Sequence, residues 1–442
     1  MILNYASIRA IFNAIKPNIM KKHILTLIFL FSACYLFAQN LSSVWNDFQK
    51  APADKQNLAD SIAKYRTGVI VVKTAPNTKV QLEQQKHEFW FGCALTSGAF
   101  DGSFDENDTD MYKKKFLENF NSAVTSSSLK WHHMEPEKGK VDFSVTDNIL
   151  TWADENNLPL RGHNLYWGIY YVQDWVKALT DEQLYDELYK RARTIAPRYK
   201  GRFFEYDFNN EMMHGDYYQE RLGPGITKKM AEWIKEYDHG AKLFLNDYDI
   251  LTGNMLQDYV DHINDLQGRG MPIDGIGVQG HLHADDFSRD TLWHAFDVLS
   301  RFGLPIRITE FNMPGQRSRF RRDTSLEPTG VEEAQFAQNL KDYYRICFAH
   351  PAVDGILMWH FWAGANWIPA SSMYRKDWTE TKLASAYRNL VYDEWWTSYS
   401  GKTNRDGYCM IPAFFGVHKV TVNGIEKTIE LSKQNKAAYI EF

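Results

Sequence analysis

The segment FFEYDFNNE, residues 203–211, is a short apolar run that ends in two asparagines and a glutamate. Seven further runs of this kind lie along the 442-residue chain: FWFGCAL at 89–95, SAVTS at 122–126, LPLRGHN at 158–164, KLFLNDY at 242–248, GIGVQGH at 275–281, PIRITEF at 305–311 and GILMWHF at 355–361. Longer amphipathic stretches separate them, among them 181–195 and 331–350. Eight strands that alternate with helices predict an α/β fold, a (β/α)8 TIM barrel, over residues 88–400.

Polar residues gather near the carboxyl ends of these runs, where a TIM barrel carries its active site. Glu211 closes the fourth run and Glu310 stands near the end of the seventh. A carboxylate is costly to bury unless it is hydrogen-bonded or used in chemistry. Two facing glutamates in a groove of Trp, His and Asn residues suit glycoside hydrolysis, in which one acid protonates the leaving oxygen and the other carboxylate attacks or activates water. Structural salt bridges and another barrel chemistry are the alternatives that the pattern leaves open.

The segments that flank the barrel have a different character. Residues 39–87 are predicted to be a lead-in, with a polar helix over 44–65 and strands at 69–72 and 80–82. Residues 401–442 are predicted to be a small C-terminal β appendage, in which a hairpin turns at Asn423-Gly424. The shortness of this appendage favours packing against the barrel over a separate carbohydrate-binding module.

The N-terminal residues have the pattern of a targeting segment. Lys21, Lys22 and His23 precede an apolar run that ends at Ala38, which predicts a signal peptide region over 1–38, with Met20 as an alternative start. The protein is therefore expected to be secreted or periplasmic. Lipoprotein anchoring through Cys34 is the alternative, and the apolar residues 35–37 that would follow the lipidated cysteine argue against it. No later run is long enough to predict a membrane span.

Composition and charge exclude several classes of function. The 50 basic and 55 acidic residues give a net charge of -5, so no global positive field attracts nucleic acid. The four cysteines, Cys34, Cys93, Cys347 and Cys409, lie far apart and have no histidine partners at zinc-ligand spacing. We expect buried thiols, no metal and no cofactor. The sequence predicts no particular oligomeric state.

Seven longer segments follow one another along the chain: LKWHHMEPEKGKVDF (129–143), RGHNLYW (161–167), YDFNNEMMHGDYY (206–218), LFLNDYDI (243–250), IDGIGVQGH (273–281), LPIRITEFN (304–312) and DGILMWHFWAGANW (354–367). In this order they resemble glycoside hydrolase family 10, the (β/α)8 endo-xylanases. The details NNEMMHG, MWHFW and GVHKVTV look most like the plant-type branch of that family.

This resemblance implies a retaining double displacement on xylan, with Glu211 as general acid/base and Glu310 as nucleophile. It also implies a set of sugar-binding residues. Asn210 would bind the sugar 2-hydroxyl, Lys130, His163, Tyr248, Gln279 and His281 would line the subsites, and Trp131, Trp167, Trp359 and Trp367 would form the floor and walls. The donors Gln279, His281 and Asn210 are expected to keep Glu310 ionised, and the charge of Glu310 to raise the pKa of Glu211.

Three departures from the family pattern bear on the substrate. Ser126–Ser128 replace a segment that usually contains an asparagine, residues 168–171 (GIYY) replace a polar segment, and Asn312 replaces an aspartate, which predicts a less basic His281. The loop PGQRSRFRRD at 314–323 carries four arginines. It is interpreted as a solvated loop, or as a site for glucuronic acid side chains. Another β-glycan as substrate, or a non-catalytic polysaccharide-binding barrel, are the alternatives to a xylanase.

Overall fold

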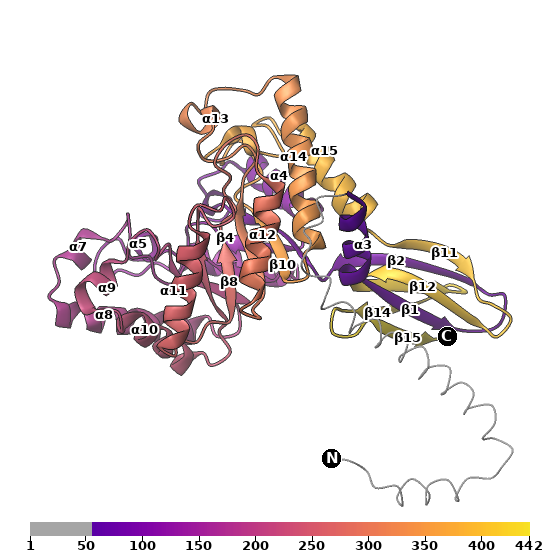
Figure 1. Cartoon of the computed structure of the whole chain (residues 1–442), viewed down its shortest axis with the longest axis horizontal. Coiled ribbons are helices and arrows are strands. Elements are labelled where there is room, and N and C mark those ends of the chain that lie inside the picture. The colour runs from indigo at the N-terminus through magenta and orange to yellow at the C-terminus, as the bar shows by residue number, and fades with distance from the viewer. Residues whose placement is uncertain (1–54) are drawn as a thin grey trace, which may run out of the picture. The chain divides into compact units, whose positions relative to one another are not determined.

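The computed structural model describes residues 55–442 (Figure 1). The predicted signal region 1–38, Cys34 and the part of the predicted helix that precedes Lys55 lie outside the described residues. The predicted helix is present as α3 (Lys55–Arg66), and it leads directly into β1 (Thr67–Lys73).

A closed barrel of eight strands forms the centre of the fold, which confirms the predicted TIM barrel. The strands follow one another around the barrel in the order β10-β3-β4-β5-β6-β7-β8-β9, and every neighbouring pair is parallel. Their bounds are β3 (Trp90–Leu95), β4 (Ser122–Thr125), β5 (Leu160–Gly162), β6 (Glu205–Asn210), β7 (Leu243–Asp247), β8 (Gly275–Val278), β9 (Ile306–Phe311) and β10 (Val353–Met358). Seven of them lie within one of the predicted apolar runs, and β10 begins two residues before the run at 355–361.

Helices connect the strands and cover the barrel. The longest are α8 (Asp181–Arg198) and α14 (Gly330–Ala349), and both begin with a capping box, on Thr180 and Thr329 respectively. The others are α4 (Glu106–Asn119), α5 (Trp131–Met134), α6 (Ser144–Glu155), α7 (Asp174–Lys177), α9 (Tyr217–Leu222), α10 (Ile226–Tyr237), α11 (Leu256–Gly268), α12 (Arg289–Ser300), α13 (Arg319–Arg322), α15 (Lys382–Arg388) and the short turns η1 (Ser97–Ala99), η2 (Pro369–Ser371) and η3 (Asn389–Glu394).

Side chains along the barrel strands alternate between the helices and the barrel interior. On β6, Tyr206 and Phe208 belong to the main hydrophobic core. The carboxylates that alternate with them, Glu205 and Asp207, bind Arg307 of β9 and Arg161 of β5 respectively. Side chains on both faces of the strand are buried. For this reason the sequence of a barrel strand does not show the alternation of apolar and exposed polar residues that marks a half-exposed strand.

Strands β6 and β9 each contain one extra residue near their carboxyl ends. Between Asp207 and Asn210, β6 advances three residues while β7 advances two, from Phe244 to Asn246. The pairing of β9 with β10 shifts in the same way, because Ile308–Phe311 on β9 lie opposite Ile356–Met358 on β10. Such a bulge re-aims the side chains that follow it. These two strands carry or precede the two predicted catalytic glutamates.

The lead-in and the C-terminal segment form one structure, although the sequence suggested two separate ones. Strands β1 and β2 (Lys79–His87) come from the lead-in, and β11 (Ser398–Lys402), β12 (Tyr408–Phe414), β13 (Gly416–Val422), β14 (Ile425–Leu431) and β15 (Ala437–Glu441) come from the C-terminal segment. They build a three-stranded sheet, β12-β1-β15, and a four-stranded sheet, β11-β2-β13-β14. The predicted hairpin is β13–β14, and its turn residues Asn423 and Gly424 both have positive φ, at 50° and 81°.

The two sheets enclose a core of their own and dock onto the amino ends of the barrel strands. Ile70, Val72, Val80 and Leu82 of the lead-in are fully buried against residues of the C-terminal strands. At the junction with the barrel, buried Arg66 donates hydrogen bonds to the carbonyl oxygens of Phe348 and His350, both at 2.6 Å, and of Val353 at 2.7 Å.

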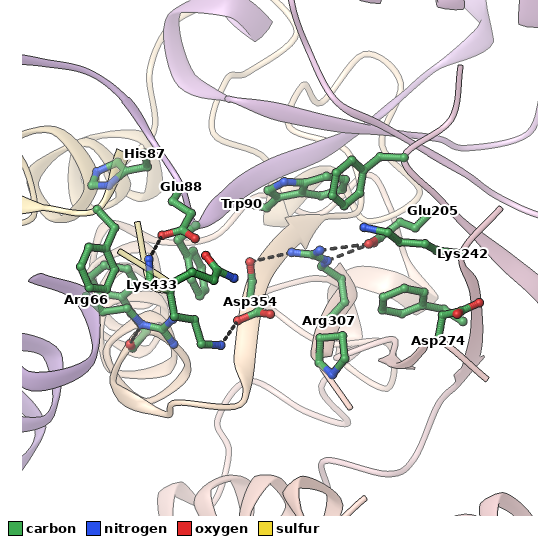
Figure 2. Close-up of a pocket in the computed structure, with 17 residues that line it drawn as sticks. Arg66, His87, Glu88, Trp90, Glu205, Lys242, Asp274, Arg307, Asp354 and Lys433 are labelled. Carbon is green, nitrogen blue, oxygen red and sulfur yellow. Dashed lines mark hydrogen bonds and ion pairs between the residues drawn. The ribbon is translucent and has the colours of Figure 1, made fainter. Parts of the chain in front are cut away.

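A cavity of about 380 Å³ lies at this junction (Figure 2). The barrel contributes residues at strand starts, such as Trp90, Glu205 and Arg307, and the sheets contribute Phe415 and Lys433. Several of its charged groups already have partners: Lys433 pairs with Asp354 at 2.9 Å, and Arg307 with Glu205. Because the barrel residues that line it stand at the starts of strands, the cavity lies at the opposite end of the barrel from the predicted active site. We assign it a structural role.

The structure also tests two further expectations, that the cysteines are buried thiols and that no segment spans a membrane. Cys93, Cys347 and Cys409 are free and buried, as expected. Between residues 55 and 442, no helix combines the length and the apolar character needed to cross a bilayer.

Candidate active site

The predicted site residues converge at the carboxyl ends of the barrel strands. His163 follows β5, Glu211 follows β6 directly, Tyr248 follows β7, and Trp359 follows β10, while Glu310 lies on β9. Gln279 and His281 follow β8, and Lys130 lies in the segment after β4. The fold thus brings together residues that are far apart in the sequence. Lys130 and Trp359 are 229 positions apart, and the Lys130 Nζ lies 5.8 Å from the Trp359 ring centroid.

Glu211 is buried and accepts two hydrogen bonds. The Gln279 amide donates to Oε1 at 2.8 Å, and the Trp167 indole N–H donates to Oε2 at 2.9 Å. Burial raises the pKa of Glu211, and the negative charge of Glu310 raises it further, against the opposing effect of the two donors. A carboxyl group whose pKa lies above its ordinary value is suited to hold a proton and give it up.

Glu310 is equally buried, but its surroundings favour the charged form. His281 Nε2 lies 3.1 Å from Oε2, and the Asn246 amide donates to Oε1 at 3.0 Å. Burial alone would raise the pKa of Glu310. The hydrogen bond with His281 and the electrostatic effects of His163 and His281 outweigh burial and hold the pKa below its ordinary value. An ionised carboxylate is what a nucleophile requires.

The donors to Glu310 differ in part from the expected ones. His281 takes the expected place, but Gln279 donates to Glu211 instead of Glu310. Asn210 does not donate to Glu310 either: its Oδ1 accepts from Asn246 at 2.9 Å, which leaves its amide nitrogen without a partner among the described residues. The structure assigns the missing donor role to Asn246.

Asn246 is the functional residue that the sequence reasoning did not single out. It is the penultimate residue of β7 and is 2% exposed. Its amide donates to both Asn210 and Glu310, and its Oδ1 accepts from Thr309 Oγ1 at 2.6 Å. The available signal was its position in the run KLFLNDY, where a buried strand ends in an amide.

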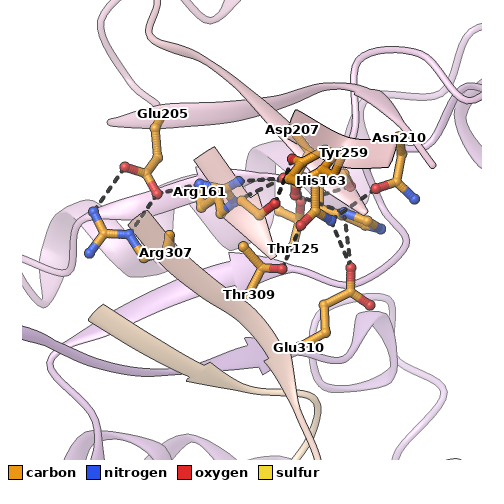
Figure 3. Close-up of polar contacts among 12 residues, drawn as sticks. Thr125, Arg161, His163, Glu205, Asp207, Asn210, Tyr259, Arg307, Thr309 and Glu310 are labelled. Atoms are coloured by element: carbon orange, nitrogen blue, oxygen red, sulfur yellow. Dashed lines mark hydrogen bonds and ion pairs between the residues drawn. The ribbon is translucent and has the colours of Figure 1, made fainter. Parts of the chain in front are cut away.

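A chain of buried charges runs through the barrel interior beneath the site (Figure 3). Arg307 binds both carboxylate oxygens of Glu205 at 3.0 Å, and Arg161 bridges Glu205 and Asp207. Asp207 in turn binds His163 Nδ1 at 2.8 Å, and that nitrogen lies 4.0 Å from Glu310 Oε1. Burial would raise the pKa of both Glu205 and Asp207, but the arginines outweigh it and keep both below their ordinary values. The chain fixes the orientation of the His163 ring next to Glu310.

Three tryptophans and Lys130 surround the two glutamates. Lys130 Nζ lies 4.7 Å from the Trp167 ring centroid and faces Trp359 as well. Trp359 packs edge-on against His163 at 5.2 Å, and Trp367 lies 5.0 Å from His281. All three tryptophans keep part of their surface exposed, so their rings are available for stacking against sugar faces.

Trp131 does not occupy the predicted position on the wall of the site. It is 4% exposed and belongs to the hydrophobic core, where its indole N–H donates to Glu135 at 2.8 Å. The ring also packs edge-on against Trp175 at 5.6 Å. Because almost none of the Trp131 ring is accessible, it packs in the core instead of stacking on a ligand.

The replaced segment 168–171 creates an aromatic surface beside Glu211. Tyr170 and Tyr171 are 63% and 57% exposed. The Tyr170 hydroxyl lies 3.0 Å from that of Tyr248, and Tyr248 stacks on His214 with ring centroids 3.5 Å apart. A Cβ on Gly168 would come within 2.6 Å of Asp216, the N-cap of α9, so the glycine is needed where α9 begins. The surface on this side of the site is therefore aromatic where the family pattern has polar residues.

The other two departures have structural partners in the fold. Ser126 Oγ donates to the Leu95 carbonyl at 2.8 Å, and Ser127 Oγ lies 2.9 Å from Ser97 Oγ. Asn312 donates to the Trp359 carbonyl and accepts from the Trp367 indole N–H, both at 3.1 Å. Asn312 therefore positions two of the tryptophans.

Comparisons with known proteins agree with this geometry. The family model described as Glycosyl hydrolase family 10 matches residues 81–391. The chain is 32% identical over 352 residues to the anti-sigma-I factor RsgI6 of Acetivibrio thermocellus, which covers 79% of this chain and 43% of that protein. It is 35% identical over 318 residues to endo-1,4-beta-xylanase 1 of Arabidopsis thaliana, which covers 71% of this chain and 31% of that protein. The chain thus spans less than half the length of these two relatives.

A solved structure shares the fold. The crystal structure of xylanase 10B from Thermotoga petrophila RKU-1 in complex with xylobiose aligns with a TM-score of 0.62 and 24% identity, over 70% of this chain and 95% of that one.

Proposed function

This chain belongs to glycosyl hydrolase family 10, with plant members among its similar relatives, and from that premise we propose that it is a secreted, retaining endo-β-1,4-xylanase. The observation that carries the proposal is the pair of buried carboxyl groups at the carboxyl ends of the strands, whose pKa values are shifted in opposite directions. Oppositely tuned carboxyl groups identify an acid and a nucleophile.

In the first step, ionised Glu310 attacks the anomeric carbon of the sugar while protonated Glu211 gives its proton to the glycosidic oxygen. The bond between sugar and leaving group breaks, and an ester forms between the sugar and Glu310. Asn246 and His281 hold the two carboxylate oxygens of Glu310, so the attacking atom is fixed before substrate arrives. The unpartnered amide nitrogen of Asn210 is available to donate to a sugar hydroxyl.

In the second step, Glu211 acts as a base. Formation of the ester removes the negative charge of Glu310, and that charge is one cause of the raised pKa of Glu211. The pKa of Glu211 therefore falls at the point where Glu211 must take a proton from water. The activated water attacks the anomeric carbon, the ester bond breaks, and both carboxyl groups return to their starting states.

The test is a product analysis. The purified protein is incubated with glucuronoxylan, arabinoxylan and a mixed-linkage glucan, beside a Glu310→Ala variant. Short xylo-oligosaccharides from the intact protein alone, first formed as the β-anomer in proton NMR, are the expected result. The α-anomer as first product would contradict retention, and cleavage of the glucan alone would mean that the departures at 126–128 and 168–171 have changed the sugar.

The second candidate function is a polysaccharide-binding protein without catalysis. The observation that favours it is the similarity to a protein named as an anti-sigma factor. A pure binder, however, does not need an acid and a nucleophile with opposite pKa shifts. Binding of xylan without any release of reducing ends would select this alternative.

Secretion is part of the proposal because of the pattern in residues 1–38. N-terminal sequencing of the protein exported by a bacterial host should find Gln39 as the first residue. A lipid-modified Cys34 at the N-terminus would instead identify a lipoprotein.

A further inference from the structure

The arginine-rich loop at residues 314–323 is held rigidly at the edge of the active site. Its backbone amides at Gly315, Gln316 and Arg317 donate to carbonyls of the loop after β8, at 2.9, 2.7 and 2.8 Å. Phe320 is fully buried and packs edge-on against Phe336 of α14. The segment is therefore a fixed support for its side chains, although its composition is that of a solvated loop.

Two of the four arginines in this loop are already paired with carboxylates. Arg317 lies 3.4 Å from Asp249, and Arg319 lies 2.7 Å from Glu332. Arg321 and Arg322 are exposed, and among residues 55–442 neither has a carboxylate within ion-pair distance. The one acidic residue of the loop, Asp323, accepts hydrogen bonds from the backbone and side chain of Ser325. The loop thus presents two uncompensated positive charges.

Arg321 differs from Arg322 in its relation to the active site. Its guanidinium carbon lies 4.9 Å from the ring centroid of Trp367, and the Trp367 ring lies 5.0 Å from that of His281, which binds Glu310. Stacking on the ring limits the motion of the guanidinium, while its N–H groups stay free to bind a ligand. The Arg322 side chain has no hydrogen bond, ion pair or cation–π contact in the described part of the chain.

We propose that Arg321, stacked on Trp367, is a binding site for the carboxylate of a uronic acid side group on the xylan chain. This rests on the proposed function, because Trp367 is taken to stack on a sugar of the main chain. A planar guanidinium binds a carboxylate through two parallel hydrogen bonds, and a neutral arabinose side group offers no such partner. Arg321 therefore determines which decorated xylans the enzyme prefers.

The test compares glucuronoxylan with the same polymer after chemical reduction of its carboxyl groups, so the two substrates differ only in a carboxylate that has become an uncharged hydroxymethyl group. The wild-type protein should have the higher kcat/KM on glucuronoxylan. Arg321→Gln should lower kcat/KM on glucuronoxylan about five- to tenfold and leave the reduced polymer within about twofold. Arg322→Gln is the matched control and should change neither. An equal kcat/KM of the wild-type protein on the two polymers, or an equal effect of both variants, overturns the proposal.

A binding measurement separates this proposal from the proposed function. In a Glu310→Gln background, calorimetry with a uronic-acid-substituted xylo-oligosaccharide should show tighter binding than with its carboxyl-reduced form, and Arg321→Gln should abolish the difference. Selective binding without hydrolysis by the intact protein would support the Arg321 site and reject the xylanase. Hydrolysis of xylan without tighter binding of the charged oligosaccharide would support the xylanase and reject the Arg321 site.

Discussion

Glu211 and Glu310 have similar burial, but their hydrogen-bond partners differ in a way that supports the proposed roles of acid and nucleophile. Glu211 accepts hydrogen bonds from two uncharged donors, Gln279 and Trp167, while burial and the negative charge of Glu310 raise its pKa. Glu310 is held by an amide and an imidazole above the buried charge chain. The sign of each pKa shift has a consequence for stability as well as for catalysis.

We expect opposite effects on stability from the two isosteric variants at pH 7. Glu310 has a lowered pKa, so its charge stabilises the fold above the unfolded pKa of about 4.5, and this contribution is lost as pH falls through the folded pKa. Glu310→Gln should therefore lower the melting temperature at pH 7 and have less effect at low pH. Glu211 has a raised pKa, so Glu211→Gln should raise the melting temperature at pH 7. Calorimetric melting from pH 3 to 8 checks both, and shifts of the same sign would contradict this assignment.

The opposite pKa shifts also predict the pH dependence of activity. The profile of kcat/KM should be bell-shaped, with its acid limb below the ordinary glutamate value of about 4.5 and its alkaline limb above it. The acid limb reports loss of the Glu310 charge, and the alkaline limb reports loss of the Glu211 proton. If both limbs lay on the same side of pH 4.5, the roles assigned here to Glu310 and Glu211 would be wrong.

Asn246 tests whether an amide outside the predicted site positions the nucleophile. Asn246→Asp keeps the shape of the side chain but places an acceptor opposite Glu310 Oε1, which raises the pKa of Glu310. The expected results are a fall in kcat of about 10²-fold and an acid limb moved to higher pH. Asn107→Asp, an exposed change in the first turn of α4, is the control for added charge. A lower kcat with an unmoved acid limb would indicate that Asn246 has a structural role alone.

The strands show how far the sequence predicts the site and where it stops. Apolar runs predicted all eight strands, and their polar ends predicted the face that carries the site. Strict alternation along β9, however, would give Glu310 the orientation of Ile308, toward the helices. The extra residue in β9 turns Glu310 toward His281 and Asn246 instead. Nothing in PIRITEF marks that bulge, because the register of β9 depends on its pairing with β10.

Close packing between barrel strands gives a prediction for β8. A Cβ on Gly277 would come within 2.4 Å of the Leu245 carbonyl oxygen and 3.0 Å of Arg161, whereas a Cβ on Gly268, the last residue of α11, meets nothing within 4 Å. Gly277→Ala should lower the free energy of unfolding by about 1–3 kcal/mol. Gly268→Ala should leave it unchanged or raise it by up to about 1 kcal/mol. Urea denaturation measures both, and equal effects would mean that the strands separate to admit the methyl group.

The two-sheet unit joins the ends of the described chain into one structure. Strand β1 pairs with β12 and β15, and β2 pairs with β11 and β13, so the lead-in has no sheet without the C-terminal segment. The sequence predicted several of these strands but not their partners. The partner strands lie more than 300 residues apart in the sequence. Side chains alternate between the two faces of a strand in the same way whichever strand it pairs with, so no local pattern identifies the partner.

A chain that ends at Lys402 should therefore fail to fold stably. Loss of β12 to β15 exposes Ile70, Val72, Val80 and Leu82, each worth about 1.5–3 kcal/mol when fully buried. Their sum is comparable to the whole stability of an ordinary domain. Soluble expression and thermal melting by circular dichroism test this. A truncated protein with the melting temperature of the intact chain would show that the sheets are dispensable.

The placement of this two-sheet unit at the amino ends of the barrel strands has a practical consequence for handling the protein. The last residue, Phe442, follows β15, so an affinity tag or a solid support attached after it emerges on the side away from Glu211 and Glu310. Beads coupled through the C-terminus would present the catalytic face outward to a long, insoluble polymer. Random coupling through surface lysines would give the molecules no such common orientation.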